Sequence, residues 1–261
     1  MTKLQIITCL GENTVPICTE IARALSETTG LEIFFEPKAL PTEAAEPLCR
    51  GEIAMGWICG LLYTIKVDKA AVPFELLAAP VFAGEDVPVY HSKLVVAKES
   101  PLSSFDDLRG SCLAINETTS YSGFHLLRST LVQRGLTLDY FGEVFVAGAH
   151  SKSMRAVAEG EADVATIDHS VFDYVVEAFP GIAGQIKVIG HLGPAPAPPF
   201  VVHQSVPEEA KMRLQQGFLA LGTDPAFIQL VQRHRLQGLV SINDGYYDAI
   251  RRDYMRSLSL S

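Results

Sequence analysis

Hydroxyl side chains are concentrated in one short stretch, where four of five consecutive positions carry them: Thr118, Thr119, Ser120 and Ser122. The pattern before it, at 111–115, is that of a buried strand, and the pattern after it, at 124–133, is that of a helix. The first backbone N–H groups of a helix lack internal partners, and the helix dipole adds partial positive charge. One Ser or Thr is enough to cap a helix, so four hydroxyls favour an anion site.

The overall charge limits the classes of partner. The 261 residues carry a net charge of −9 with a pI near 5.3. Nucleic acid would require a basic stripe that neutralises phosphates, so it is not expected as a partner. The charge also argues against an anionic membrane surface, and no apolar run reaches the ~20 residues of a membrane-spanning helix. An anionic ligand would therefore be held by local donors.

The cysteines and the first residues bear on location. The five cysteines are odd in number and form no C-x-x-C pair, which is typical of small buried residues in a reducing compartment. Met1–Ile7 leads directly into an apolar strand and shows no signal peptide. The protein is expected to be cytoplasmic if the chain is full length as given, and periplasmic if an export signal was removed. No metal and no cofactor is predicted.

Strands and helices alternate in two parts of the chain. The predicted strands include 4–8, 31–36, 53–57, 90–98, 111–115, 144–147 and 162–167. This order predicts an α/β protein of two lobes, each a mostly parallel sheet with flanking helices. Residues 1–91 and 191–261 are assigned to the first lobe and 92–190 to the second, with a ligand cleft between them. The proline-rich run 193–199 is predicted to be an extended connector. The helices predicted beyond Pro207 are expected to pack back on the first lobe.

Strand ends place further candidate residues. Ligands of open α/β sheets bind at the carboxyl ends of strands. In the second lobe, Thr119–Gly123 and Gly148–Ser151 both follow strands and begin helices. Two converging helix starts could hold a tetrahedral oxyanion, with His150 as a further donor. The alternatives are that His150 is a cap or surface residue, and that Asp168, at the end of the next strand, caps a helix rather than binding ligand.

Four segments resemble a known family. Residues 51–63 read G-E-I-A-M-G-W-I-C-G-L-L-Y, and residues 148–165 read G-A-H-S-K-S-M-R-A-V-A-E-G-E-A-D-V-A. The other two are 90–98 followed by F-D-D-L-R-G, and S-Y-S-G at 120–123. Together they resemble the phosphonate-binding solute receptors of ABC transporters, which also take phosphate, phosphite and related oxyanions. The similarity spans nearly the whole chain.

The resemblance implies a two-lobed fold of the type II periplasmic-binding-protein class that closes on its ligand by a hinge. It also implies the ligand-binding residues: Ser120, Tyr121, Ser122 and His150 for the oxyanion, Tyr63 and Tyr90 for the walls, and Asp168 for the variable end. Thr119, from the hydroxyl turn, is predicted to bind with them. Tyr121 stands where the family has a small residue, so it is expected to fill part of the pocket.

The predicted function is that of a solute-binding protein for a small phosphonate-like oxyanion, with an ABC permease as partner. No catalytic residue is predicted, because the sequence contains no G-x-S-x-G, G-x-x-x-x-G-K-[ST], G-x-G-x-x-G or H-E-x-x-H motif. The alternatives are a cytoplasmic enzyme and a cytosolic ligand sensor on the same fold, since fold alone does not fix function.

Overall fold

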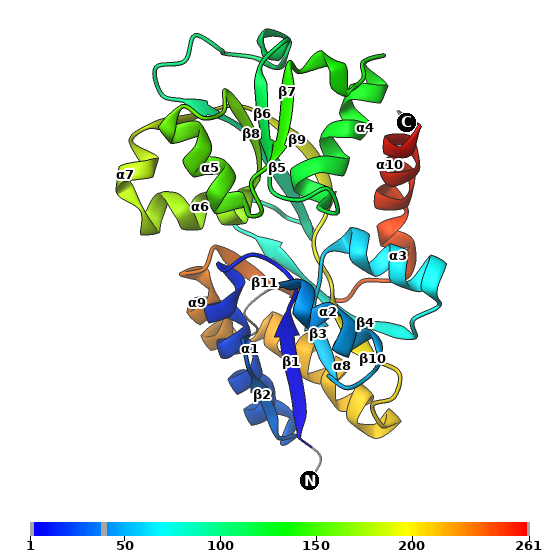
Figure 1. Ribbon diagram of the computed structural model, residues 1–261. Helices are drawn as coiled ribbons and strands as arrows, with labels where there is room; N and C mark the ends of the chain where they lie inside the picture. Colours follow the sequence, from blue (N-terminus) through cyan, green and yellow to red (C-terminus); the bar gives the residue numbers. More distant parts are fainter. Residues whose placement is uncertain (1–2, 38–40, 260–261) are drawn as a thin grey trace. The chain divides into compact units, whose positions relative to one another are not determined.

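A computed structural model describes residues 3–37 and 41–259. These residues divide into two compact units, coloured by sequence in Figure 1. The first contains the described residues within 1–89 and 196–248, and the second those within 90–195 and 249–261. The chain therefore passes from one unit to the other three times, whereas the sequence predicts two passages.

The sheet of the first unit is mixed. Its strands are β1 (Leu4–Thr8), β2 (Ile33–Phe35), β3 (Met55–Trp57), β4 (Phe74–Phe82), β10 (Phe200–His203) and β11 (Leu236–Val240). They lie in the order β11-β4-β10-β3-β1-β2. The pairs of β1 with β2 and β3 are parallel, as the helical crossovers between them require, and the pairs involving β10 and β11 are antiparallel. The predicted parallel order thus holds around β1 only.

Helices surround this sheet. They are α1 (Thr14–Thr29), α2 (Pro41–Cys49), α3 (Gly60–Ala70), α8 (Glu208–Thr223), α9 (Pro225–Gln232) and the short η4 (Asp244–Tyr247). The apolar face of α1 is buried at Ile17, Ile21 and Leu25, as its helical spacing predicts. This helix packs against β2 and α8.

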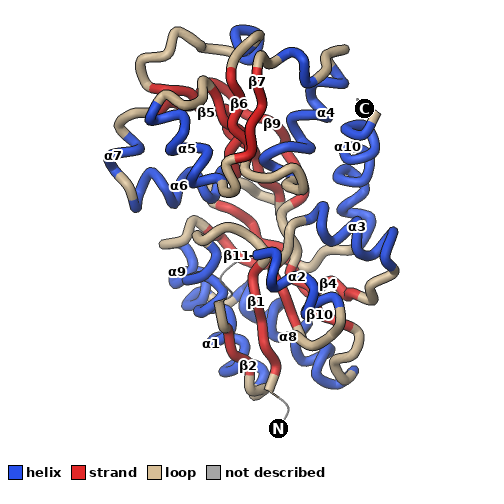
Figure 2. Tube along the Cα trace, viewed as in Figure 1, coloured by secondary structure: helices blue, strands red, loops and turns tan. Residues whose placement is uncertain are grey.

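The second unit has its own sheet, coloured red in the upper part of Figure 2. Its strands are β5 (Val89–Ala97), β6 (Cys112–Ile115), β7 (Glu143–Val146), β8 (Val164–Asp168) and β9 (Ile186–Pro196), in the order β7-β6-β8-β5-β9. β6 runs parallel to β7 and β8, and β5 runs antiparallel to β8. The prolines at the end of β9 lie in an edge strand, where a missing N–H is tolerated.

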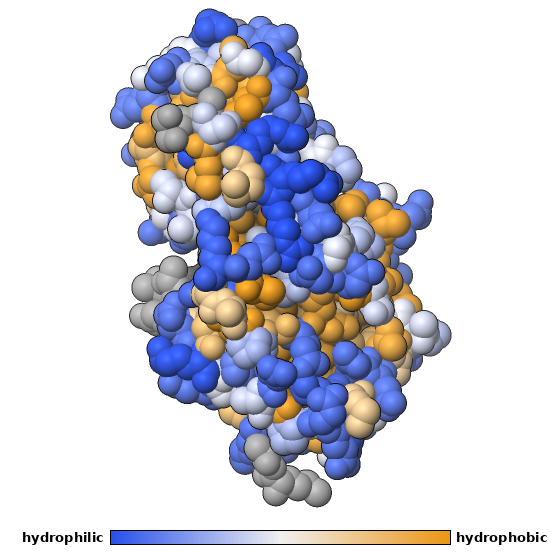
Figure 3. Space-filling model, turned by 90° about the vertical axis from the view of Figure 1, so that its right-hand side faces the viewer, coloured by the Kyte–Doolittle hydropathy of each residue, from blue (hydrophilic) through white to orange (hydrophobic). Residues whose placement is uncertain are grey.

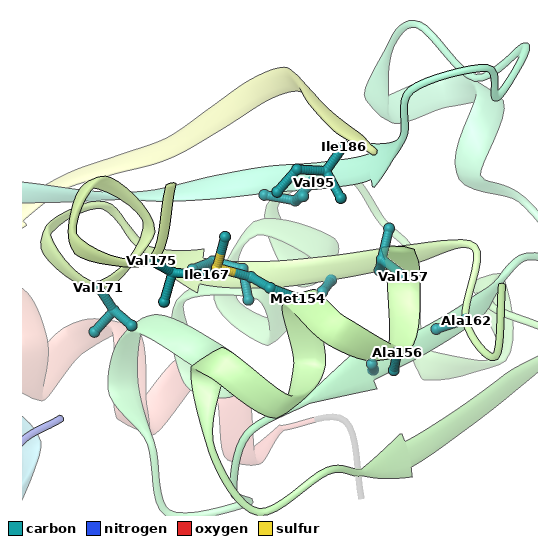
Figure 4. Packing of buried hydrophobic residues seen from close by; sticks show 11 residues of the cluster. Val95, Met154, Ala156, Val157, Ala162, Ile167, Val171, Val175 and Ile186 are labelled. Carbon is teal, nitrogen blue, oxygen red and sulfur yellow. The ribbon is translucent and has the colours of Figure 1, made fainter. Parts of the chain in front are cut away.

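The helices of the second unit are α4 (Leu126–Gln133), α5 (His150–Glu159), α6 (His169–Ala178), α7 (Pro180–Ala183) and α10 (Asp248–Leu258), with the short η1 (Phe105–Leu108), η2 (Tyr121–His125) and η3 (Leu138–Tyr140). Figure 4 shows how α5 packs on the sheet. Met154 and Val157 of α5, Ile167 of β8 and Val95 of β5 belong to one buried cluster. The cluster fixes the start of α5 against the end of β8.

The position of the last helix differs from the prediction made from the sequence. The sequence places α10 on the first lobe, but α10 bonds to the second unit. The Tyr121 hydroxyl donates to Asp253 Oδ2 at 2.7 Å, and the Ser129 hydroxyl donates to Asp253 Oδ1 at 2.8 Å. Strand β11 is a second difference, because the sequence predicts only helices beyond Pro207. β11 is a short edge strand that contains Gly238, so its sequence pattern is weak.

The surface is mixed in character. Figure 3 shows hydrophilic residues over much of the face that it presents, with hydrophobic residues in patches between them. Among the large apolar side chains, Met255 is 64% exposed and Val146 is 54% exposed. Within the ranges 3–37 and 41–259, every helix is too short or too polar to cross a membrane.

Candidate functional site

The carboxyl ends of three neighbouring parallel strands form one edge of the second unit's sheet. Asn116 follows β6, the segment Gly148–His150 follows β7, and Asp168 ends β8. Backbone hydrogen bonds hold the first two segments together: the N–H of Ala147 donates to the carbonyl of Ile115, and the N–H of Gly148 donates to that of Asn116, both at 2.8 Å. The predicted helix starts at 119–123 and 148–151 therefore lie at the same edge.

The hydroxyl turn is wound more loosely than an α-helix. In η2, the N–H of His125 donates to the carbonyl five residues earlier, on Ser120, at 3.1 Å. Such wide turns are rare and occur often at functional sites. Ser120 caps the turn, since its Oγ accepts from the N–H of Gly123 at 3.0 Å. The Thr166 hydroxyl donates to the carbonyl of Gly123 at 2.5 Å, which fixes the turn to β8.

Ser122 and His150 meet where the two helix starts converge. Ser122 Oγ lies 3.4 Å from His150 Nε2, and His150 Nδ1 is buried without a hydrogen-bond partner among the described residues. Burial lowers the pKa of His150 below its usual range, although the Asp168 carboxylate opposes this shift. The ring is therefore neutral at pH 7 and can take up a proton when an anion arrives.

The start of α5 adds further donors. Its cap residue, Ala149, offers no side chain to the first-turn N–H groups, which have no partner within the helix. The Lys152 ammonium also lies near the start of α5. Its Nζ is close to Gly148, which precedes the helix, since a Cβ added to Gly148 would lie 3.9 Å from it. The site thus combines two helix starts, two hydroxyls, one neutral imidazole and a nearby ammonium, a set of groups suited to an oxyanion.

Asn116 is a component that the sequence reasoning did not select. Its Oδ1 is buried without a hydrogen-bond partner among the described residues. A Cβ added to Gly123 would lie 1.7 Å from this oxygen and 3.1 Å from His150 Cε1. Asn116 and His150 therefore pack directly on Gly123. The one signal in the sequence is that Asn116 is the first residue after a predicted strand.

Other predicted residues make different contacts. The Thr119 side chain is exposed, and its hydroxyl donates to Glu117 at 3.3 Å. Asp168 Oδ1 accepts from the N–H and the hydroxyl of Ser170 at 2.8 and 2.7 Å, so Asp168 caps α6 and also acts on the pKa of His150. The alternative of a cap therefore holds, and a ligand role of Asp168 stays a prediction.

The three predicted tyrosines are all buried. The Tyr121 hydroxyl donates to Asp253 on α10. The ring centre of Tyr90, at the start of β5, lies 6.2 Å from that of His169. Tyr63 belongs to the first unit, where its hydroxyl donates to Asp244 Oδ1 at 2.8 Å. The second unit thus brings together Ser120, Ser122, His150 and Asp168.

His125 makes the stability of this region depend on pH. It is buried behind the turn, with Nδ1 2.8 Å from Ser257 Oγ. Burial, with a smaller effect of Arg128, lowers the pKa of His125 from 6.5 to about 4. An unfolded chain takes up this proton first as the pH falls, so stability is complete above about pH 6.5 and is lost towards pH 4. We expect a loss of about 3 kcal/mol.

Urea denaturation of the wild type and of His125→Asn between pH 7.5 and 4 measures this effect. The variant lacks the titrating ring, so its free energy of unfolding should fall less steeply over this range. Equal slopes for the two proteins would contradict the assignment to His125.

The surroundings of two cysteines keep their thiols protonated. Burial raises the pKa of Cys9 to about 12 and raises that of Cys18 as well, so neither thiol is ionised at neutral pH. In the part of the chain that the structure describes, no group of three or more His, Cys, Asp or Glu side chains is placed to hold a metal ion.

Comparisons with known proteins show which family and which fold the chain resembles. Residues 11–247 match the family described as "ABC transporter, phosphonate, periplasmic substrate-binding protein". The chain is 24% identical over 230 residues to the phosphonates-binding periplasmic protein of Escherichia coli K12. That alignment covers 85% of this chain and 66%, just under two thirds, of the relative.

Two solved structures share the fold. A binding protein component of an ABC phosphonate transporter from Pseudomonas aeruginosa has a TM-score of 0.84 and 18% identity, covering 99% of this chain and 87% of its own. PhnD1 from Prochlorococcus marinus, in complex with methylphosphonate, has a TM-score of 0.83 and 16% identity, covering 99% of both chains. These similarities confirm the predicted type II periplasmic-binding-protein fold.

Proposed function

The chain belongs to the family of phosphonate-binding periplasmic proteins of ABC transporters, and we propose that it captures a small phosphonate-like oxyanion. The observation that carries the proposal is the convergence of two helix starts at one sheet edge, with Ser122 Oγ 3.4 Å from His150 Nε2. Neutral donors at helix starts are well suited to a multiply charged oxyanion, because they offer hydrogen bonds without fixed countercharges.

The roles of the individual groups follow from their chemistry. Ser122 and the first N–H groups of α5 donate to the anion oxygens, and His150 gains a proton as the anion offsets the cost of its burial. Lys152 contributes attraction from the rim of the site. Local donors are needed, because the chain as a whole carries a charge of −9 and repels anions at long range.

The ligand class and the partner come from the relatives. A relative with this fold binds methylphosphonate, which supports a ligand of that size and charge. Membership of the family supports work in the periplasm, delivery to an ABC permease, and binding without catalysis. Closure of two lobes on the ligand, with Tyr63, Tyr90 and Asp168 along its walls, stays a prediction from the sequence.

Calorimetric titration tests the proposal. The wild type is titrated with methylphosphonate, 2-aminoethylphosphonate, phosphate, phosphite and sulfate, and at least one phosphorus oxyanion is expected to bind. Ser122→Ala and His150→Gln should each weaken that binding by about 10- to 150-fold, because each removes a hydrogen bond to a charged group, worth about 1.5–3 kcal/mol.

Thr130→Ala is the matched control. Its hydroxyl donates to the carbonyl of Leu126 within α4, so its loss should leave the affinity within about twofold of wild type. Full affinity in both Ser122→Ala and His150→Gln would rule out this site. A wild type that binds none of the five anions would rule out the function.

A further inference from the structure

One buried residue of the second unit contacts both halves of the candidate site. Thr166 lies in β8, the strand between β6 and β5, and it is fully buried. Its hydroxyl donates at 2.5 Å to the carbonyl of Gly123, the residue that follows Ser122 in the hydroxyl turn. Its backbone carbonyl interacts with the His150 ring and raises the pKa of that ring, against the larger effect of burial. Thr166 therefore acts on the turn through its side chain and on the histidine through its backbone.

The alternation of side chains along β8 explains why the Thr166 hydroxyl meets the turn. Ala165 and Ile167 belong to the buried cluster between the sheet and α5 (Figure 4). Successive side chains of a strand point to opposite faces of the sheet, so Thr166 points to the other face, where η2 packs against β8. A hydroxyl without access to water needs a hydrogen-bond partner inside the protein, and the Gly123 carbonyl is that partner.

The bond from Thr166 holds the turn beside the residue that faces His150. The N–H of Gly123 donates to Ser120 Oγ at 3.0 Å, and its carbonyl accepts from Thr166, so both backbone groups of Gly123 are fixed. Wide turns are rare in helices, and bonds from outside the turn help to hold this one. Ser122 is the adjacent residue, and its Oγ lies 3.4 Å from His150 Nε2. This short distance therefore depends on the place at which β8 holds Gly123.

We propose that Thr166 is a positioning residue for the anion site of the second unit, and that its hydroxyl holds Ser122 where Ser122 and the start of α5 can donate to the same oxyanion. Thr166 does not donate to the ligand itself, because its one hydroxyl proton is directed at the Gly123 carbonyl. This inference rests on the proposed function, since its consequence is a change in ligand affinity.

The test compares Thr166→Val with Thr166→Ser by titration with the phosphorus oxyanion that wild type binds most tightly. Valine keeps the branched shape of threonine and removes the hydroxyl, so the Gly123 carbonyl loses its partner. Thr166→Val is expected to bind about 10-fold more weakly, whereas Thr166→Ser, which keeps the hydroxyl, should stay within about threefold of wild type. Thr166→Cys, whose thiol is a weak donor of similar size, replaces Thr166→Val if that variant does not fold.

A double-mutant cycle and a control separate positioning from mere destabilisation. In the Ser122→Ala background, Thr166→Val should weaken binding by about twofold at most, because the group that Thr166 positions is already absent. Tyr140→Phe is the matched control, since the buried Tyr140 hydroxyl donates to the carbonyls of Phe105 and Asp106 at 2.8 and 3.0 Å. These residues precede β6 and β7, at the edge of the sheet opposite the site. Tyr140→Phe should lower the thermal midpoint and leave the affinity within about twofold of wild type.

The inference is overturned if Thr166→Val binds as tightly as Tyr140→Phe, or if it loses the same factor of affinity with and without the Ser122 hydroxyl. An equal loss in Thr166→Ser and Thr166→Val also overturns it, because the hydroxyl would then not be the group that matters. Each of these results, with a wild type that binds an oxyanion, leaves the proposed function standing. A wild type that binds none of the five anions overturns the proposed function, and the positioning role with it.

Discussion

Replacing Gly123 with alanine is expected to lower the affinity for the oxyanion at least 100-fold, which corresponds to about 2.7 kcal/mol. A Cβ at this position would lie 1.7 Å from Asn116 Oδ1 and 2.8 Å from Asn116 Cγ, both impossible distances. The clashing amide is buried, so the added methyl group has to displace it from a packed position. The same Cβ would lie 3.1 Å from His150 Cε1, so we expect the packing of Asn116 and His150 on the turn to change and the contact between Ser122 and His150 to be lost.

Titration of Gly123→Ala with the ligand that wild type binds measures this loss. Gly181→Ala in α7 is the control, since an added Cβ there would meet no atom within 4 Å. The double variant Gly123→Ala with Asn116→Gly removes the clashing amide and should recover part of the affinity. Wild-type affinity in Gly123→Ala would show that the close packing of Asn116, Gly123 and His150 has no part in the site.

The local part of the site could be predicted from the sequence. Ser120 and Ser122 lie between a strand pattern and a helix pattern, and hydroxyls before a helix follow a rule that acts within a few residues. His150 was found in the same way. Their meeting at 3.4 Å depends on β6 and β7 being neighbours in the sheet, and the sequence does not fix the order of strands.

The role of Asn116 could not be predicted, because it depends on the packing of three segments rather than on a pattern. The same holds for Tyr121. The sequence shows a large residue inside a loop of small ones, which suggests that it fills the pocket. Its hydroxyl bonds instead to Asp253, which lies 132 residues further along the chain. Only a folded structure shows an acceptor so distant in sequence.

The fold, like the candidate site, could be predicted from the sequence only in part. The alternation of strands and helices was readable for β1, β6 and α1, because each has a clear apolar period. Helix α10 also has a regular apolar face, but a helical period does not say which unit that face will cover. Its partners are decided by Asp253, Tyr254 and Ser257, which contact residues of η2 and α4. Contacts between segments far apart in sequence therefore set both the unit boundary and the support of the turn.

Asp253→Ala is expected to destabilise the second unit by about 3–5 kcal/mol, the cost of removing one partner from a largely buried charged network. The carboxylate accepts from Tyr121, Ser129 and Arg256, and its side chain is 18% exposed. Its loss leaves two buried hydroxyls without their acceptor, each costing about 1–3 kcal/mol. The thermal midpoint of the second unit should fall by roughly 10–20 °C.

Calorimetric unfolding measures this fall in the thermal midpoint. The fall should be larger than the one caused by breaking an ion pair on the surface, because the Asp253 side chain is only 18% exposed. Asp106→Ala is the control in the same unit, because Asp106 is 84% exposed and its ion pair with Arg134 is worth less than about 1 kcal/mol. Tyr121→Phe alone should cost about 1–2 kcal/mol, and should cost almost nothing further once Asp253 is alanine. Additive losses would mean that the Tyr121–Asp253 bond contributes nothing of its own. A non-additive result would identify this bond as the contact by which the last helix stabilises the hydroxyl turn that contains Ser120 and Ser122.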